Sequence, residues 1–216
     1  MSERTANEQA HAQAVREMFA GIATKYDFLN HFLSVNIDKR WRKLVRQKLE
    51  KELNDVNALI LDVACGTGDL SVELQQNGTA KVIGTDFCRP MLTIAAEKNA
   101  KNNLSIPYLE GDGMNLAFPD ETFDLAFFCG VLEYVPLDEA LHESARVLKT
   151  GAPLVLLPVK PSIVGSVLEL LYNFKIHPLQ SVKETASKYF NIICNHEFPI
   201  TEPISWSKTI FVLEKK

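Results

Sequence analysis

The sequence predicts an α/β fold in which helices cover both faces of a mostly parallel sheet. From residue 60 onward, short apolar segments with the character of strands alternate with helical segments. This alternation is typical of parallel strands joined by crossover helices. The segment 123–129 is almost wholly apolar, as expected for a strand buried on both faces of such a sheet. With 216 residues, the chain suits one domain with a single large core and extensions.

The expected elements are separated by recognisable helix ends. Gly78 ends the first helix of the sheet domain, and Pro90 opens the next in a favourable first-turn position. Lys149 and Gly151 follow a later helix and suit a carboxyl-terminal cap. The predicted strands cover residues 59–64, 81–86, 106–110, 123–129, 152–159, 190–198 and 206–213. The predicted helices cover residues 69–76, 90–101, 137–148, 163–174 and 181–189. The last two strands are expected to pair as a closing antiparallel hairpin.

The first part of the chain has a different texture. Residues 1–55 are predicted to form a helical arm ahead of the sheet domain at 56–216. A helix is expected over 11–20, followed by a turn-rich or mobile element over 21–30. An amphipathic helix is predicted over 38–53, with an apolar face formed by Trp41, Leu44, Val45, Leu49 and Leu53.

The predicted helix over 38–53 is also strongly basic. Between residues 39 and 48 its charged side chains are Lys39, Arg40, Arg42, Lys43, Arg46 and Lys48. A basic amphipathic helix can make peripheral contact with an anionic membrane. The alternative, which is commoner for such helices, is a helix packed on the core with a solvated basic face. The oligomeric state stays open too, with a homodimer as one option.

Composition and charge exclude several classes of function. The net charge of −4 argues against a nucleic-acid partner. The sequence contains no apolar run as long as a membrane span and no apolar signal segment at its start, so we expect a cytoplasmic protein. The four cysteines and five histidines are spaced without a metal-ligand pattern, which predicts free thiols and no metal site.

The segment 59–71 has the strongest functional signal, because a buried strand runs into a glycine turn and then a helix. Asp62 precedes Gly66 and Gly68 of the turn, and Asp86 ends the next strand. Such a turn lets the backbone approach a ligand closely at the carboxyl end of a parallel sheet. An acid that ends the second strand is placed to bind a ribose diol. The pattern predicts a ligand built on a nucleoside.

The details of the turn indicate which nucleoside. A dinucleotide-binding turn needs a third glycine, and none follows Gly68 at the required position. Asp62 would face a pyrophosphate, so the pattern disfavours a nicotinamide oxidoreductase and favours a cationic amino-acid group. The combination of Asp62, Gly66, Gly68 and Asp86 resembles the S-adenosylmethionine site of class I methyltransferases. The resemblance implies a Rossmann-like fold with a seven-stranded sheet.

The arm resembles a narrower family, the menaquinone and ubiquinone C-methyltransferases. The matching residues are Met18-Phe19, Ala23, Tyr26-Asp27, Asn30, Leu33-Ser34 and Trp41-Arg42. The resemblance continues through residues 61–69, 86–92, 116–124, 146–149 and 160–161. It implies an S-adenosylmethionine-dependent methyltransferase, of EC 2.1.1 class, that methylates a ring carbon of a prenylated quinol in quinone biosynthesis, demethylmenaquinol to menaquinol type. We expect the arm to be a lid, because methyl transfer requires that water be excluded.

The resemblance also implies the donor-binding residues. Asp62 would face the amino or sulfonium group, and Asp86 would take the ribose hydroxyls. The glycine turn, Gly66, Thr67 and Gly68, would contact the methionine part. Asp112 and Gly113, after the third strand, would meet the adenine edge. Cys129, at the end of the fourth strand, would line the floor near the methyl group. Asp112 also suits a simple turn and Cys129 ordinary apolar filling.

Two departures from the family pattern bear on the acceptor. Glu133 stands where the family has an arginine beside the quinol, and the tyrosine-rich insertion beyond Pro161 is mostly missing. A carbon acceptor becomes electron-rich when a ring hydroxyl loses its proton, and a phenol has a pKa of about 10. A general base should therefore lie near the acceptor. The candidates are Tyr26, Asp27 and Glu133; our hypothesis is Glu133, which could equally be a surface acid at a helix start.

Two other functions stay open. The shortened tail fits a methyltransferase of a soluble small molecule. A protein of the quinone pathway that binds S-adenosylmethionine without catalysis, as a sensor or scaffold, is the other. The intact arm argues against that third function, because a sensor has little use for a lid over an acceptor.

Overall fold

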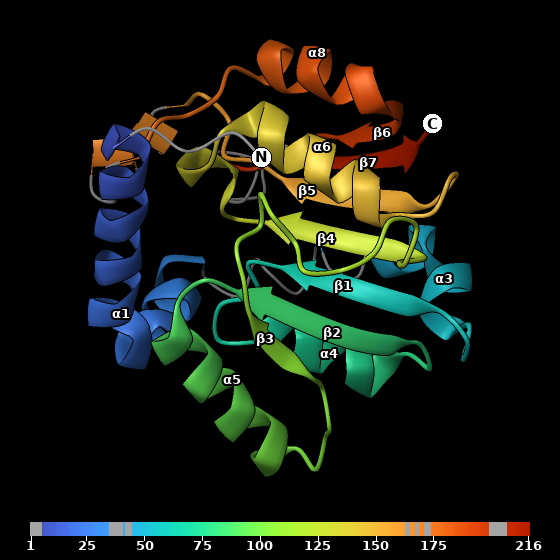
Figure 1. Cartoon of the computed structure of the whole chain (residues 1–216), viewed down its shortest axis with the longest axis horizontal. Coiled ribbons are helices and arrows are strands. Elements are labelled where there is room, and N and C mark those ends of the chain that lie inside the picture. Colours follow the sequence, from blue (N-terminus) through green and yellow to red (C-terminus); the bar gives the residue numbers. More distant parts are fainter. Residues whose placement is uncertain are drawn as a thin grey trace.

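A seven-stranded sheet forms the centre of the computed structural model, with the strand order β3-β2-β1-β4-β5-β7-β6 (Figure 1). The strands β3, β2, β1, β4 and β5 pair in parallel in this order, whereas β7 runs antiparallel to both β5 and β6. The strands are β1 (Leu59–Val63), β2 (Lys81–Asp86), β3 (Tyr108–Glu110), β4 (Leu125–Cys129), β5 (Pro153–Leu157), β6 (Phe190–His196) and β7 (Ile210–Lys215). The predicted seven strands, their order along the chain and the closing antiparallel pair are confirmed.

The structure describes residues 6–34, 41, 45–162, 165–166, 169–170, 174–198 and 207–216. Most of the predicted helix over 163–174 lies outside these ranges, as do Lys39, Arg40, Arg42, Lys43 and Leu44 of the predicted helix over 38–53. Within them, no helix has the length and apolar character that crossing a bilayer requires.

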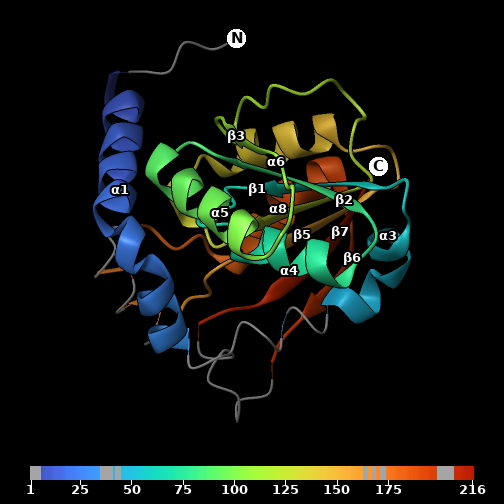
Figure 2. The same ribbon diagram turned by 90° about the horizontal axis from the view of Figure 1, so that it is seen from below.

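Helices cover both faces of the sheet, as predicted. Helices α6 (Leu137–Val147) and α8 (Leu179–Tyr189) pack on one face, where Ala140, Leu141 and Val182 meet alternate side chains of β1, β4, β5 and β7. Helices α4 (Asp69–Asn77) and α5 (Arg89–Lys101) lie side by side over the other face (Figure 2). Successive side chains of a strand point to opposite faces, so the central strands are buried on both.

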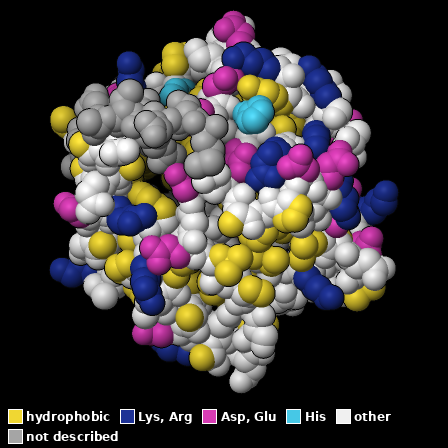
Figure 3. All heavy atoms as spheres, in the orientation of Figure 1, with side chains coloured by type: hydrophobic (Ala, Val, Ile, Leu, Met, Phe, Trp, Pro, Cys, Tyr) yellow, Lys and Arg dark blue, Asp and Glu magenta, His cyan; other side chains and the backbone are white. Residues whose placement is uncertain are grey.

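An ion pair links α6 and α8 on their outer surface. Lys188 and Asp138, one from each helix, form an ion pair of 2.7 Å between two exposed side chains. Figure 3 shows acidic and basic side chains intermixed over these helices, while apolar side chains gather below the centre of the same face. Exposed pairs of this kind contribute little to stability, so the α6–α8 contact depends mainly on its apolar side.

The amphipathic stretch predicted over 38–53 is confirmed as core-packed on its apolar side. Trp41, Val45, Leu49 and Leu53 are buried against β1, β2 and α4. The stretch is not one uniform helix, because the backbone bends at Leu49 (φ −116°, ψ 28°) and the helix α3 (Glu50–Asn54) follows. The bend keeps the last apolar side chain on the core while the chain turns toward β1.

Helix α1 (Ala6–Ser34) corrects one prediction, because the turn-rich element expected over 21–30 is part of a single helix of 29 residues. Gly21 weakens a helix by only about 1 kcal/mol, and a side chain there would meet no atom within 4 Å. Apolar residues at helical spacing, among them Val15, Phe19 and Ala23, continue past Gly21 and pack on the domain. Tertiary contacts on both sides of Gly21 thus override its local preference. In Figure 1, α1 stands across the carboxyl ends of β1, β2 and β4.

Candidate active site

The turn after β1 has the conformation that its glycines allow. Ala64, Gly66 and Gly68 have φ values of 54°, 56° and 76°, in the left-handed region. A Cβ at Gly68 would lie 2.4 Å from the Tyr108 hydroxyl oxygen and 2.9 Å from the Ala95 Cβ. Position 68 thus requires glycine for both its conformation and its space. Ala64 is a strained non-glycine residue, and it lines the cavities described below.

Asp86 connects the turns that follow β1 and β2. Its Oδ2 accepts a hydrogen bond from the Gly66 amide at 2.9 Å, and its Oδ1 accepts one from the Cys88 amide at 2.8 Å. The carboxyl group is 6% exposed. Burial raises its pKa, although the two amides and the charge of Arg16 oppose the rise. Asp86, the residue predicted to bind the ribose, therefore also holds the glycine turn in place.

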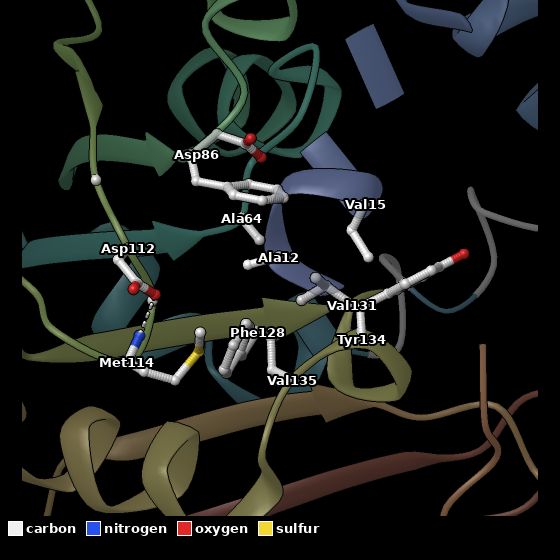
Figure 4. A pocket seen from close by; sticks show the side chains of 13 residues that line it. Ala12, Val15, Ala64, Asp86, Asp112, Met114, Phe128, Val131, Tyr134 and Val135 are labelled. Atoms are coloured by element: carbon white, nitrogen blue, oxygen red, sulfur yellow. Dashed lines mark hydrogen bonds between the residues drawn. The ribbon is translucent and has the colours of Figure 1, made fainter. Parts of the chain in front are cut away.

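Two adjoining hollows lie at the carboxyl ends of the parallel strands, beside the turns after β1 and β2. Their volumes are about 500 and 370 Å³, including space open to solvent. Both are lined by Ala64, Asp86, Phe87 and Val131. Figure 4 shows the larger one, with Asp86 on one wall and apolar side chains of α1 on another. Mainly apolar clefts with a few polar groups are typical binding sites for small molecules.

The larger hollow contains the residues predicted for the adenine edge. Asp112 and Gly113 line it, together with Met114. The Met114 amide donates a hydrogen bond of 3.0 Å to Oδ1 of Asp112 (Figure 4), so this acid also shapes its own turn. A Cβ at Gly113 would lie 3.1 Å from Cγ1 of Val63 and 3.4 Å from Cζ of Phe128, so the backbone here packs closely on the sheet and favours glycine.

The smaller hollow contains the turn and the end of β4. Gly66, Cys129 and Gly130 line it on the domain side, while Phe19 and Tyr26 of α1 line it on the other. Cys129 thus lines a hollow at the end of β4, and its place on the floor near the transferred methyl group stays a prediction. The side chain of Asp27 lies outside the described part of the chain.

Two residues predicted to bind the donor are buried and line neither hollow. Asp62 is 2% exposed and its Oδ2 accepts a hydrogen bond of 2.6 Å from the Ser71 hydroxyl. Thr67 is 2% exposed, and its Oγ1 accepts a hydrogen bond of 2.9 Å from Nζ of Lys98, which also pairs with Asp69. Neither lines a hollow, so their direct contact with the donor stays a prediction. Nothing in the sequence near the turn pointed to Lys98.

Helix α1 meets the domain through rings. Phe19 lies 5.3 Å from the Tyr134 ring of the domain and 6.0 Å from the Tyr26 ring of α1 itself, both at steep angles. One turn earlier on α1, the Arg16 guanidinium lies 5.4 Å from the centre of the Phe87 ring. Edge-to-face rings and a cation over a ring are attractive contacts, so α1 is held at both hollows.

Glu133 lies on the short helix η1 (Leu132–Tyr134), between β4 and α6. It is 7% exposed, and its Oε1 accepts a hydrogen bond of 2.5 Å from the Val159 amide. It therefore does not sit on the surface. It is absent from the residues that line the two hollows, and its role as a base stays a prediction.

A second set of residues shapes the site from outside it. Arg146 of α6 donates to the carbonyl oxygens of Leu116 and Phe118 at 2.9 and 2.8 Å, and it forms an ion pair of 2.7 Å with Glu143. Oε1 of Glu143 accepts the Leu116 amide at 2.7 Å. This network holds the loop that leads from Asp112 to β4. The segment 146–149 resembles the quinone C-methyltransferases in sequence, but that resemblance does not indicate the positioning role of Arg146.

Comparisons with known proteins agree with this geometry. The model of the ubiE/COQ5 methyltransferase family matches residues 5–179. The demethylmenaquinone methyltransferase of Deinococcus radiodurans is 38% identical over 173 residues, which are 77% of this chain and 70% of the relative. The enzyme of the same name from Thermus thermophilus is 40% identical over 153 residues, 69% of this chain and 67% of the relative.

Solved structures show the same fold. The geranyl diphosphate C-methyltransferase of Streptomyces coelicolor, crystallised with Mg²⁺, geranyl diphosphate and S-adenosyl-L-homocysteine, superposes with a TM-score of 0.71 at 12% identity, over 82% of each chain. A putative sarcosine dimethylglycine methyltransferase from Galdieria sulphuraria gives 0.69 at 14% identity, over 82% of this chain and 86% of that one. The chain belongs to the ubiE/COQ5 methyltransferase family and is an S-adenosylmethionine-dependent methyltransferase with the Rossmann-like fold of class I.

Proposed function

We propose that this protein transfers the methyl group of S-adenosylmethionine to a ring carbon of a prenylated quinol, demethylmenaquinol to menaquinol type. The observation that carries the proposal is the pair of apolar hollows that share Asp86 and are both walled by α1, the larger by Ala12 and Val15 and the smaller by Phe19 and Tyr26. The relatives named demethylmenaquinone methyltransferase, at 38–40% identity, support the choice of acceptor.

The residues present fit the donor. The larger hollow offers an apolar wall, the backbone at Gly113 and the acid Asp112 to an adenine ring. Asp86 lies between the two hollows and can accept hydrogen bonds from ribose hydroxyls, as acids ending a second strand do. The backbone of Gly66 to Gly68 would meet the methionine part. We propose supporting positions beneath the turn for Asp62 and Thr67. When bound, S-adenosylmethionine supplies an electrophilic methyl group on a sulfonium.

The chain itself supplies orientation and exclusion of water. In-line displacement depends mostly on holding the reacting groups in line. Phe19 and Tyr26 close the smaller hollow from the α1 side, opposite Gly66 and Cys129. We place the acceptor ring beside them. Among the candidates for proton transfer, Tyr26 lines this hollow, so we propose that its hydroxyl contacts the acceptor, with Asp27 next to it in the chain as the candidate base.

We also propose that the arm over residues 1–55 is divided in function. Helix α1 acts as the lid on the domain over 56–216, because its apolar residues line both hollows. The stretch from Trp41 to Leu53 is part of the core. Since its apolar face is buried there, a membrane contact by its basic face would be electrostatic and peripheral. Such a contact suits a cytoplasmic enzyme whose acceptor is a lipid.

The test is mass spectrometry of a reaction that contains S-adenosylmethionine and a chemically reduced demethylmenaquinone of short prenyl chain. A carbon-methylated product is expected, and it should disappear in the Asp86→Asn protein. A parallel reaction with soluble phenols separates the two acceptor classes. Donor binding with turnover on phenols alone would replace the quinol by a soluble acceptor, and binding without turnover on either would leave a non-catalytic binding protein.

A further inference from the structure

The feature that carries a further inference is a buried carboxylate outside the donor hollows. Glu133 is 7% exposed, and the Val159 amide donates to its Oε1 at 2.5 Å. Burying a carboxylate is costly unless hydrogen bonds compensate for lost water. The hydrogen bond that compensates for the burial of Glu133 comes from the backbone amide of Val159, just after β5.

Glu133 belongs to an element that cannot hold its own shape. The helix η1 is a single 3₁₀ turn of three residues, and such turns are stable only when their surroundings fix them. Two long-range hydrogen bonds do so: that of Glu133 to Val159, and one of 3.0 Å between Nε2 of His177 and the Leu132 carbonyl oxygen. Leu132 itself is fully buried.

The same turn forms one of the contacts between the domain and the lid. Tyr134 lines the larger hollow. Its ring lies 5.3 Å from that of Phe19 on α1 and 5.3 Å from that of Phe174. Figure 4 shows Tyr134 facing the α1 side of the cavity, close to Val131. Any shift of η1 would therefore disturb the contact of Phe19 with Tyr134, one of those that hold α1 in place.

We infer that Glu133 is a positioning residue: through Val159 it fixes η1, so that Tyr134 receives Phe19 and holds α1 over the donor. This assignment differs from the base hypothesis, which requires the carboxylate to reach the acceptor. It rests on the proposed methyl transfer only for its kinetic readout, because lid closure and donor binding can be measured without turnover.

The two roles separate in the variants Glu133→Gln and Glu133→Ala. A glutamine oxygen can still accept from the Val159 amide, so the Gln protein should keep donor affinity and kcat within about threefold, with an unchanged pH profile of kcat. The Ala protein should bind S-adenosylhomocysteine about tenfold more weakly, measured by calorimetry. Amides of α1 between residues 12 and 26 should also exchange hydrogen for deuterium faster. Glu139→Ala, an exposed acid of the next helix, is the matched control and should change nothing.

Phe19→Ala tests the same contact from the lid side and does not touch the domain core. It should reproduce the faster exchange of α1 and the weaker donor binding. Combined with Glu133→Ala it should add little, because both changes release one contact. Unchanged α1 exchange and donor affinity in Phe19→Ala would overturn the inference. Loss of turnover in Glu133→Gln, with normal binding and exchange, would overturn it too and restore the base.

Failure of the proposed function gives a different result. If no quinol is methylated by the unaltered protein, while α1 exchange and donor affinity still respond to Glu133→Ala and Phe19→Ala, the positioning role is supported and the acceptor is wrong.

Discussion

The Gly66 amide donates a hydrogen bond of 2.9 Å to Oδ2 of Asp86, so the residue that ends β2 holds the turn that follows β1. Asp86 thus holds the turn and also lines both hollows, in which we propose that the donor binds. The two tasks share the same side chain, and several predictions depend on this coupling.

Replacing Asp86 by Asn should weaken donor binding by about 10- to 100-fold, because the charge that receives the ribose hydroxyls is removed and only one oxygen remains to accept amides. Calorimetry with S-adenosylhomocysteine measures the loss. Glu97→Gln, an exposed acid on α5, is the control and should bind as the unaltered protein does. Equal affinity in both variants would remove Asp86 from the donor site.

The pH dependence of donor binding should reveal Asp86. Burial raises its pKa above the ordinary aspartate value of 3.8, against the opposing effects of the Cys88 and Gly66 amides and of Arg16. Hydrogen bonds to ribose need the carboxylate, so affinity should fall on acidification at a higher pH than an exposed aspartate would cause. The Asn variant should lack this component when titrated between pH 4 and about 8.

Stability should change in the opposite direction. A carboxyl group whose pKa is raised by folding favours the folded state when protonated, and this contribution is lost as pH rises through the folded-state pKa. The difference in unfolding free energy between the unaltered protein and Asp86→Asn should therefore move against the unaltered protein as pH rises. Urea unfolding at several pH values measures it, and a constant difference would contradict the raised pKa.

Gly68→Ala and Gly151→Ala should separate conformation from space. Both positions have positive φ, 76° and 78°, so each alanine should cost about 1–2 kcal/mol of stability. A Cβ at Gly151 meets nothing within 4 Å, whereas one at Gly68 meets the Tyr108 hydroxyl and Ala95. Gly68→Ala should therefore be the more destabilising and should also lose donor binding. Equal unfolding midpoints in urea would show that the crowding at Gly68 is relieved freely.

Arg146→Ala should destabilise the protein by about 3 kcal/mol, because it leaves the buried carboxylate of Glu143 without its main partner. Burial alone would raise the pKa of Glu143, but hydrogen bonds from Arg146 and the Leu116 amide hold that pKa below its ordinary value of 4.5. The stabilisation should thus be present at neutral pH and be lost as pH falls below the ordinary carboxyl range. Lys188→Ala breaks an exposed ion pair and should leave the unfolding midpoint unchanged.

Tyr26→Phe tests the acceptor side. If the Tyr26 hydroxyl contacts the quinol, kcat should fall by tenfold or more while the affinity for S-adenosylhomocysteine stays unchanged, since the ring that closes the smaller hollow is kept. Single-turnover rates measure the methyl-transfer step. A normal rate would assign Tyr26 to the lid alone.

The limits of the elements show where local pattern suffices. The predicted strand over 81–86 is β2 as found, because its residues pair with β1 along nearly their whole length. The strand expected over 106–110 begins only at Tyr108, because β2 offers it the partners Gly84 to Asp86 and no others. Phe123 was expected in β4, yet it bridges to Leu148 instead. The ends of these two strands depend on pairing with residues distant in the chain, which the local pattern of side chains does not indicate.

Residues close together in the chain are enough to predict the order of strands and helices, the glycine turn and the acid Asp86, because these features depend on local pattern and backbone conformation. The continuity of α1 through Gly21, the support of the turn by Lys98, the network of Arg146 and the burial of the Glu133 carboxylate depend on how the whole chain packs. Each of these depends on a partner distant in sequence, such as Val159 for Glu133. Side-chain type indicates which partners are chemically suitable, but only packing of the whole chain brings one of them within hydrogen-bond distance.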